Sequence, residues 1–282
     1  MSIKIDNISH KYGIGTLSEI SGLIDVSFDF PDRFFYAVAG ATGSGKSTFV
    51  QHINGLLKPD SGQIDVDGFI LSSKKKECSK KIKNLRQKIG FLFQNSENQL
   101  FESTIIEDVM FGPLNFGHPK EEARKMAEEA LKTIGINEDM FDKSPFETSG
   151  GEKRRIALAG VLAYKPSILI LDEPTAGLDY KGKYDLLNLL SKLYEGGTNI
   201  IIVTHDMDTI LNVCNGVLLF SNGKLVNHYD INEFFSSDLT MYSIEDSELI
   251  NAIKSLKQRG FAVNFDNIKN VEDLLMFIRS QK

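Results

Sequence analysis

Long apolar runs are missing from this sequence of 282 residues. Unbroken runs such as residues 168–171, 200–203 and 217–220 are short, whereas a membrane-spanning helix needs roughly 18 apolar residues. No apolar segment precedes the first charges near the N-terminus, so a secretory signal is disfavoured. We therefore expect a chain that does not cross a membrane by itself and that works in the cytoplasm.

Cysteine and proline are also scarce, with 2 and 7 residues. Cys78 and Cys214 lie far apart and neither has a neighbour at CxxC spacing, which disfavours a disulfide framework and a zinc site. We expect both thiols to be structural. The 41% hydrophobic and 25% charged residues are typical of a globular chain rather than a disordered or collagen-like one.

Positive charge is in the minority, because the net charge is −6. The basic residues that do cluster are Lys74, Lys75, Lys76, Lys80, Lys81, Lys83, Arg86 and Lys88. A nucleic-acid or anionic-lipid surface is one interpretation of this cluster. No aromatic residue is interleaved and the rest of the chain is acidic, so a solvated turn and helix face is favoured and no nucleic-acid partner is expected.

Hydropathy patterns predict an α/β fold. Residues 3–5 and 23–30 alternate in the manner of half-buried antiparallel strands, which predicts a β-layer at the N-terminus. Further strands are predicted at residues 34–39, 89–93, 168–171, 199–204 and 216–220, and helices at 47–57, 120–134, 152–164, 181–194 and 207–214. Hairpin signals lie at 62–68 and 221–224, and tail helices are predicted at 231–235, 247–259 and 271–279. The alternation of strand and helix predicts a parallel sheet with helices on both faces.

A glycine-rich stretch after the strand at 34–39 matches the phosphate-binding loop pattern at every constrained position. It reads Gly40, Ala41, Thr42, Gly43, Ser44, Gly45, Lys46 and Ser47. Its backbone N–H groups suit phosphates, Lys46 suits the β- and γ-phosphates, and Ser47 suits Mg²⁺. We expect ATP and Mg²⁺ here, with Thr48 also among the nucleotide-binding residues.

The apolar run 168–171 ends in two adjacent carboxylates, Asp172 and Glu173. Catalytic groups in α/β proteins lie at such strand ends. Asp172 is therefore a candidate Mg²⁺ ligand, and Glu173 a candidate general base for an attacking water.

Between these motifs, Ser149, Gly150, Gly151 and Glu152 open a predicted helix. In this order, the three motifs resemble those of ATP-binding cassette (ABC) ATPases. The resemblance implies a P-loop (RecA-like) core over residues 1–225 with a helical subdomain at about 95–163. It also implies that this signature closes on ATP held by a second cassette, which would be a homologous chain or a second copy.

Four more positions match the family. Gln94 resembles the Q-loop glutamine that contacts Mg²⁺, and Asp179 lies in a segment resembling the D-loop at the dimer interface. His205 resembles the switch histidine beside the γ-phosphate. Tyr12 resembles the aromatic residue that stacks on adenine, although a plain surface aromatic is the alternative interpretation of this residue.

Residues 93–113 narrow the resemblance to ATPases of energy-coupling factor (ECF) transporters, and the segments around 159–163 and 172–179 look more like the second of their two ATPase subunits. The resemblance implies an ATP-hydrolysing motor at the cytoplasmic face of the membrane. Its partners would be an integral membrane scaffold and, through it, a membrane protein that binds a vitamin or transition-metal ion. The expected coupling segment contains Glu97, Gln99, Leu100 and Phe101, where packing of the two apolar residues in a core is the alternative.

Other functions stay open. One is a non-transport ABC ATPase, such as an assembly ATPase, and another is the ATPase of a different ABC importer class. A small-molecule kinase, a GTPase and a catalytically inactive partner explain fewer of the motifs. Thr148, Glu152 and Tyr180 depart from the usual family residues. Residues 226–282 are expected to form an α-rich appendage with a dimerisation or regulatory role.

Overall fold

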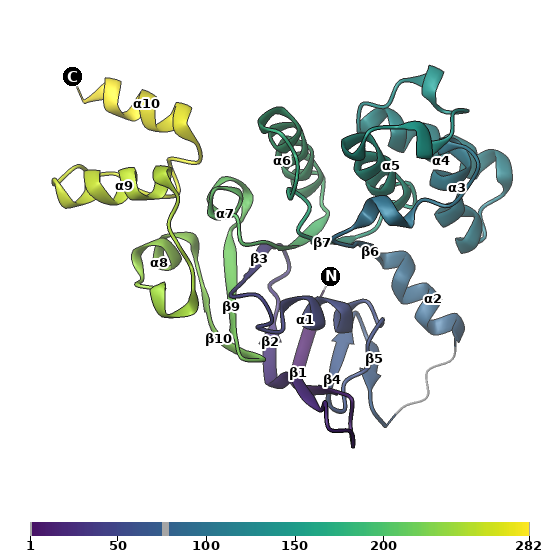
Figure 1. Ribbon diagram of the computed structural model, residues 1–282, viewed down its shortest axis with the longest axis horizontal. Coiled ribbons are helices and arrows are strands. Elements are labelled where there is room, and N and C mark those ends of the chain that lie inside the picture. Colours follow the sequence, from purple (N-terminus) through teal and green to yellow (C-terminus); the bar gives the residue numbers. More distant parts are fainter. Residues whose placement is uncertain (1, 75–78, 282) are drawn as a thin grey trace. The chain divides into compact units, whose positions relative to one another are not determined.

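The computed structural model describes residues 2–74 and 79–281. The chain divides into two compact units. The first unit combines residues 1–76 with 200–282, and the second unit consists of residues 77–199. Figure 1 shows the elements of each unit in sequence colours.

An antiparallel sheet forms the N-terminal layer of the first unit, as predicted. Its strand order is β2-β1-β4-β5. The strands are β1 (Ile3–Tyr12), β2 (Ile20–Asp29), β4 (Ser61–Val66) and β5 (Phe69–Ser72). Ile5 lies opposite Phe28 on one side and Ile64 on the other. Alternate residues are buried because one face of this sheet packs on the core.

The nucleotide-binding pattern of the first unit forms around β3 (Phe35–Ala39). This strand pairs in parallel with β8 (Asn199–Val203) and with β9 (Gly216–Ser221), and β9 pairs antiparallel with β10 (Lys224–Tyr229). The helices that follow β3 and β8 are α1 (Lys46–Ile53) and α7 (Met207–Val213). Phe49 of α1 packs on Phe220 of β9, with 4.8 Å between ring centroids, so α1 is anchored on the strand layer.

The second unit pairs two fully buried parallel strands, β6 (Ile89–Leu92) and β7 (Ile168–Asp172), with Leu92 opposite Leu171. Its helices are α2 (Ser79–Lys88), α3 (Ile105–Phe116), α4 (Lys120–Thr133), α5 (Gly150–Leu162) and α6 (Tyr180–Glu195). Short 3₁₀ turns are η1 (Ser96–Gln99), η2 (Glu138–Met140) and η3 (Pro145–Glu147). Helices α3, α4 and α5 pack on one another and form the helical part of the unit (Figure 1).

After β10 the chain forms α8 (Ile231–Ser236), η4 (Thr240–Tyr242), α9 (Glu248–Gln258) and α10 (Val271–Ser280). Phe235 and Phe265 pack 5.3 Å apart in the core of this part, beside the buried Ile250 and Ile253. Helix α8 contacts β9 and β10. Strand β10 runs through the expected boundary at residue 225, so the appended helices begin at Ile231.

The expected α/β class with an N-terminal antiparallel layer is confirmed. The sequence analysis missed α3, because Gly112 and Pro113 are typical of a helix break. Gly112 is tolerated for a packing reason, since a side chain there would collide with Tyr164 at 2.9 Å. β1 is also longer than predicted, because its alternation is interrupted by register shifts between Ile5 and Lys11.

The basic cluster lies partly on α2. Lys75, Lys76 and Cys78 fall outside the described residues. Cys214 is a buried free thiol, and burial raises its pKa, which fits the expected structural role. Within residues 2–74 and 79–281, none of the helices has the length and apolar character needed to span a membrane.

Candidate functional site

The glycine-rich loop leaves β3 at Gly40 and enters α1 at Lys46, as the motif predicts. Gly45 caps the helix with φ 103°, a conformation that favours glycine. Gly40 has φ 140°, and a side chain there would lie 2.1 Å from the Phe220 carbonyl oxygen. The Lys46 ammonium donates hydrogen bonds of 2.8 Å to the carbonyls of Gly40 and Ala41. The loop is thus curled around its own lysine.

This loop fits a phosphate group. Its helix N-terminus supplies N–H donors and positive potential, and Lys46 supplies a cation. The Ser44 hydroxyl is buried and makes no hydrogen bond within the described residues, so a donor is available inside the loop. The Gly223 N–H donates to the Ser44 carbonyl at 2.9 Å, which ties the loop to the β9–β10 turn. Ser47 and Thr48 occupy the next two positions of α1.

His205 lies at the same edge of the first unit's parallel strands as this loop. Val38 of β3 is in register with Val203 of β8, and both strands end within two residues of this pair. His205 is exposed, and the following Asp206 caps α7 by accepting from the Thr209 N–H at 3.2 Å. Tertiary structure therefore brings His205 and Gly40 to one carboxyl edge, where ligands bind in α/β folds.

Tyr12 ends β1 with its ring 41% exposed. Its hydroxyl is 3.1 Å from the Thr48 hydroxyl on α1. A side chain at Gly22 would come within 2.8 Å of the Tyr12 ring and 3.2 Å of Thr48, so this glycine makes room for both. Sequence reasoning missed Gly22, because only the pairing of β1 with β2 reveals the close approach.

In the second unit, β6 and β7 end side by side. Because Leu92 is opposite Leu171, Gln94 and the two carboxylates follow strands that end at one edge. Asp172 is 5% exposed, whereas Gln94 is exposed. Glu173 has φ 50°, an uncommon conformation for a residue with a side chain and one often found at functional sites.

The signature opens α5 with a capping box. Ser149 is the N-cap and its hydroxyl accepts from the Glu152 N–H at 3.3 Å. The Glu152 carboxylate in turn accepts from the Ser149 hydroxyl at 2.7 Å and from the Ser149 N–H at 2.9 Å. These hydrogen bonds from Ser149 lower the pKa of Glu152. Gly150 is exposed and Gly151 partly exposed in the first turn, and a side chain at either would meet no atom within 4 Å. The Glu152 carboxylate of this chain thus already occupies the Ser149 hydroxyl, one of the donors that an incoming phosphate would use.

Arg154, one turn into α5, contacts two of the other motifs. Its guanidinium donates to the Ala176 carbonyl in the D-loop segment. It also lies 3.6 Å from the Glu97 carboxylate in η1. Sequence reasoning did not single out Arg154, because neither contact has a spacing that the sequence reveals. Asp179 is the N-cap of α6 and accepts from the Gly182 N–H at 2.8 Å.

The expected coupling segment divides into a buried and an exposed part. Leu100 is 6% exposed and belongs to the core of the second unit, whereas Phe101 is 56% exposed and packs edge to face on Phe111 at 4.9 Å. Gln99 is half-buried at the end of η1. The Asp108 carboxylate accepts from the N–H of Phe101 at 2.8 Å and of the next residue at 2.9 Å. The packing alternative therefore applies to Leu100, while Phe101 presents its ring to solvent.

The expected Mg²⁺ ligands Ser47, Gln94 and Asp172 offer a hydroxyl, an amide and a carboxylate oxygen. Hard cations prefer oxygen ligands, and Mg²⁺ usually keeps several waters, so this donor set suits the ion. Ser47 belongs to the first unit and the other two residues to the second. Among the residues that the structure describes, no cluster of three or more His, Cys, Asp or Glu offers a different metal site.

Comparisons with known proteins identify the family of the chain. The family model described as "ABC transporter" matches residues 23–176. A second model, "AAA domain, putative AbiEii toxin, Type IV TA system", matches the shorter stretch 141–212. The "Energy-coupling factor transporter ATP-binding protein EcfA2" of Lactobacillus johnsonii is 43% identical over 93% of this chain and 90% of its own length. The protein of that name from Streptococcus agalactiae serotype V is 48% identical over 80% of each chain.

Two solved structures are similar over most of the chain. The structure of cbiO1 from Clostridium perfringens, described as part of the ABC transporter complex cbiONQ, has a TM-score of 0.74 and 35% identity. It covers 91% of this chain and 94% of its own. The dimeric post-hydrolysis state of the ATP-binding cassette MJ0796, bound to ADP and Pi, has a TM-score of 0.74 and 30% identity and covers 81% of this chain and 98% of its own.

Proposed function

The chain belongs to the ABC transporter ATPases and is an ATP-hydrolysing subunit of an energy-coupling factor transporter, and we propose how its own residues carry out this function. The observation that carries the proposal is the glycine loop curled around Lys46, with His205 at the same strand edge. The loop N–H groups and Lys46 bind the β- and γ-phosphates, and Tyr12 stacks on the adenine.

Hydrolysis uses groups at the strand ends. Glu173 accepts a proton from the attacking water, and His205 contacts the γ-phosphate and holds the water in line. Ser47, Gln94 and Asp172 would hold Mg²⁺, which would neutralise negative charge on the phosphates.

A second cassette completes the site in this proposal. Ser149, Gly150 and Gly151 lie at a helix N-terminus and serve the nucleotide bound to the partner's loop, with Asp179 at the interface. The partner is a homologous chain or a second copy. If the site is composite, the chain at monomeric concentrations is nearly inactive. Hydrolysis strictly first-order in enzyme under those conditions would refute the composite site.

Phe101 is the residue best placed to contact the membrane scaffold. It follows η1 directly, its ring is more than half exposed, and Phe111 extends the apolar surface. Aromatic anchors of this kind supply contact energy for a helix of a partner. Glu97 and Gln99 lie beside it in η1 and complete the coupling segment. The chain would then work at the cytoplasmic face of the membrane.

The test replaces Phe101 by Ala and measures uptake and ATP hydrolysis in membrane vesicles with the assembled transporter. We expect loss of uptake or of scaffold association while ATP binding is kept. Tyr184→Ala on α6 is the matched control, because Tyr184 is also an aromatic residue 56% exposed in the second unit. Normal uptake by Phe101→Ala would contradict the coupling role. Glu97→Lys is a poor test, because it would also break the ion pair with Arg154.

The transported substrate is a vitamin or a transition-metal ion in this proposal, and the membrane-embedded partner selects it. The substrate is most directly assigned by identifying the integral membrane proteins that co-purify with the chain from membranes. A non-transport ATPase would instead be recovered without any of them.

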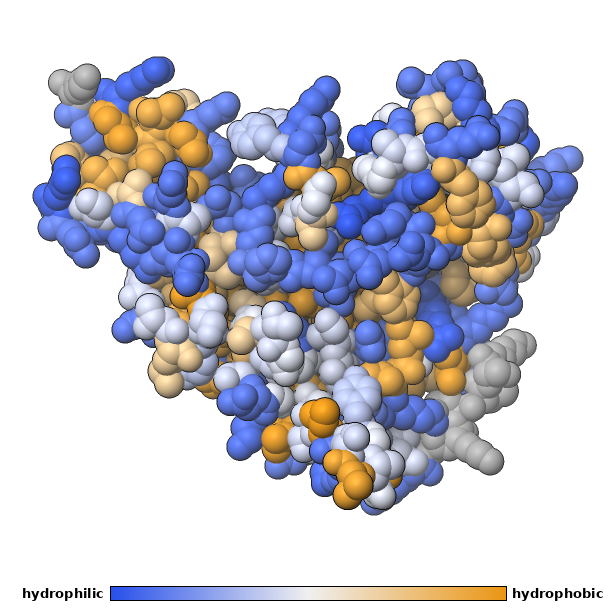
Figure 2. All heavy atoms as spheres, viewed as in Figure 1, coloured by the Kyte–Doolittle hydropathy of each residue, from blue (hydrophilic) through white to orange (hydrophobic). Residues whose placement is uncertain are grey.

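We also propose a dimerisation or regulatory role for residues 226–282. The apolar residues exposed on α10 are Val271, Leu275, Met276 and Ile278. Figure 2 shows apolar side chains gathered over α9 and α10. Exposed apolar patches on this scale mark interaction sites. Truncation after Tyr229 should weaken association of the cassettes in sedimentation experiments.

A further inference from the structure

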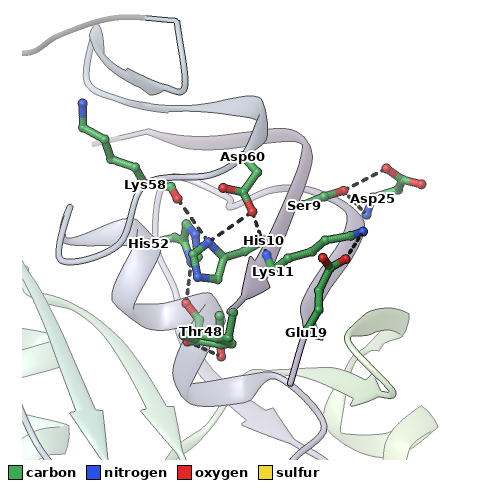
Figure 3. Close-up of polar contacts among 10 residues, drawn as sticks. Ser9, His10, Lys11, Glu19, Asp25, Thr48, His52, Lys58 and Asp60 are labelled. Atoms are coloured by element: carbon green, nitrogen blue, oxygen red, sulfur yellow. Dashed lines mark hydrogen bonds and ion pairs between the residues drawn. The ribbon is translucent and has the colours of Figure 1, made fainter. Parts of the chain in front are cut away.

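Two histidines, His10 and His52, lie close to Thr48 in the first unit (Figure 3). His10, two residues before Tyr12 on β1, packs edge to face against its ring with centroids 4.7 Å apart. His52 on α1 packs edge to face against His10, also at 4.7 Å. The imidazoles therefore touch each other and extend from Tyr12 into the protein.

His52 closes this set of contacts on α1. Its Nδ1 lies 2.7 Å from the Thr48 carbonyl oxygen, and since a carbonyl only accepts, Nδ1 is the donor. The Thr48 hydroxyl meets the Tyr12 hydroxyl at 3.1 Å. Tyr12, His10, His52 and Thr48 thus form a closed cycle that joins the end of β1 to the helix of the phosphate loop.

Charged and polar groups surround the pair unevenly. The Lys58 carbonyl oxygen lies 3.2 Å from His10 Nδ1, and the Asp60 carboxylate 3.8 Å from the same atom. Asp60 also accepts from the Lys11 N–H at 2.7 Å, and the Lys11 ammonium is paired with Glu19 at 2.7 Å.

Beside this network, Asp25 on β2 accepts from the Ser9 hydroxyl at 3.0 Å (Figure 3). The carboxylate that faces an imidazole in this network is that of Asp60, 3.8 Å from His10 Nδ1.

His52 is fully buried. Burial, followed by repulsion from His10, lowers the pKa of His52, while the backbone of Thr48 and Lys58 and the charge of Asp60 oppose this shift. Two imidazoles at this separation do not both carry a charge without repulsion. Burial and the neighbouring His10 therefore favour the uncharged form of His52.

We propose that His10 and His52 are positioning residues of the nucleotide site, and that the uncharged form of His52 holds Tyr12 and Thr48 in place for the nucleotide. Protonation of His52 breaks the cycle and weakens nucleotide binding. This inference rests on the proposed adenine contact of Tyr12. It assigns acid sensitivity of ATP binding to a site outside the phosphate loop and the catalytic residues.

The test measures ADP affinity by calorimetry on the full chain at pH 7.5 and 5.5. His52→Asn keeps an amide N–H donor for the Thr48 carbonyl and removes the titrating group. Wild type should lose up to about fivefold more affinity than His52→Asn between these pH values, which corresponds to a lowering of the His52 pKa by about one unit when ADP binds. Titration of ADP itself cancels in the comparison.

His118→Asn is the matched control, because His118 is a partly exposed histidine of the second unit paired with Glu122. It should keep the wild-type loss of affinity. If circular dichroism shows that His52→Asn is unfolded, His52→Gln takes its place, since its longer side chain also carries an amide N–H donor and no titrating group. An unchanged loss of affinity in the folded His52 variant overturns the inference.

Tyr12→Leu separates this inference from the proposed function. If Tyr12→Leu has the same ADP affinity as wild type at pH 7.5, the proposed adenine contact of Tyr12 is wrong. If Tyr12→Leu binds ADP more weakly, it should also lose the extra acid sensitivity, because the two histidines then have no Tyr12 ring to hold in place. Acid sensitivity that persists in Tyr12→Leu and vanishes in His52→Asn would overturn the positioning route.

Discussion

The capping box at the signature predicts that Glu152 restrains the activity of the chain. Its carboxylate takes hydrogen bonds from both the hydroxyl and the N–H of Ser149. A γ-phosphate from a partner site would need the Ser149 hydroxyl as well. Phosphate and carboxylate therefore compete, and the neutral side chain of Glu152→Gln should compete less well.

The magnitude follows from the two bonds. A hydrogen bond to a charged group contributes about 1.5–3 kcal/mol and a neutral one about 0.5–1.5 kcal/mol. Glu152 is partly exposed, so solvent screens part of the difference. We expect about 1 kcal/mol in favour of the phosphate-bound state, or about fivefold tighter ATP-driven association of cassettes.

The assay is ATP-dependent dimerisation, followed by light scattering in a Glu173→Gln background that prevents turnover. Glu147→Gln is the matched control, because Glu147 is exposed two residues before Ser149 and makes the same change in charge. Association of Glu152→Gln that is no tighter than that of Glu147→Gln would refute the competition.

Four further predictions concern other residues. Glu173→Gln should keep ATP binding and lower turnover on the order of 10²-fold or more, and full turnover in the assembled transporter would exclude Glu173 as the base. Asp108→Ala should lower the free energy of unfolding, measured by urea titration, by about 2–3 kcal/mol, because two N–H groups lose a charged acceptor. Asp108→Asn keeps an acceptor oxygen and should have a stability near that of wild type. Arg154→Ala should lower the maximal rate of ATP hydrolysis more than ATP affinity, since both its contacts belong to motifs beyond the phosphate loop, and an effect on affinity alone would contradict this role. His52 has a pKa lowered below 6.5 by burial, so the unfolded chain takes up the proton first as pH falls; stability should drop below about pH 6.5, and the drop should be smaller in His52→Asn.

Motifs that depend only on the backbone conformation of neighbouring residues could be predicted from the sequence. The phosphate loop needs glycine at positions of positive φ followed by a helix start, and Gly40, Gly43 and Gly45 meet that need within a few residues. The signature is local for the same reason, because Ser149 and Glu152 cap one helix end. In such patterns the residue types themselves determine the local backbone geometry, so a single sequence is enough to recognise them.

Contacts between distant segments were decided by the tertiary structure. Leu100 and Phe101 are neighbours of similar hydropathy, yet only packing against α3 determines that one is buried and the other exposed. Arg154 meets residues that are 57 positions before it and 22 after it in the sequence. Neither spacing follows a helical or strand period, so no sequence pattern indicates these contacts.

The nucleotide end of β1 shows both sides of this division. Tyr12 could be proposed from the sequence through a family resemblance, but its surroundings could not. Gly22, His10 and His52 come together with Tyr12 only because β1 pairs with β2 and packs on α1. The sequence determined the chemistry that the loop can perform, because that chemistry depends on residue type and local φ. The fold decided which side chains support it, because support depends on register and close packing between elements far apart in the chain.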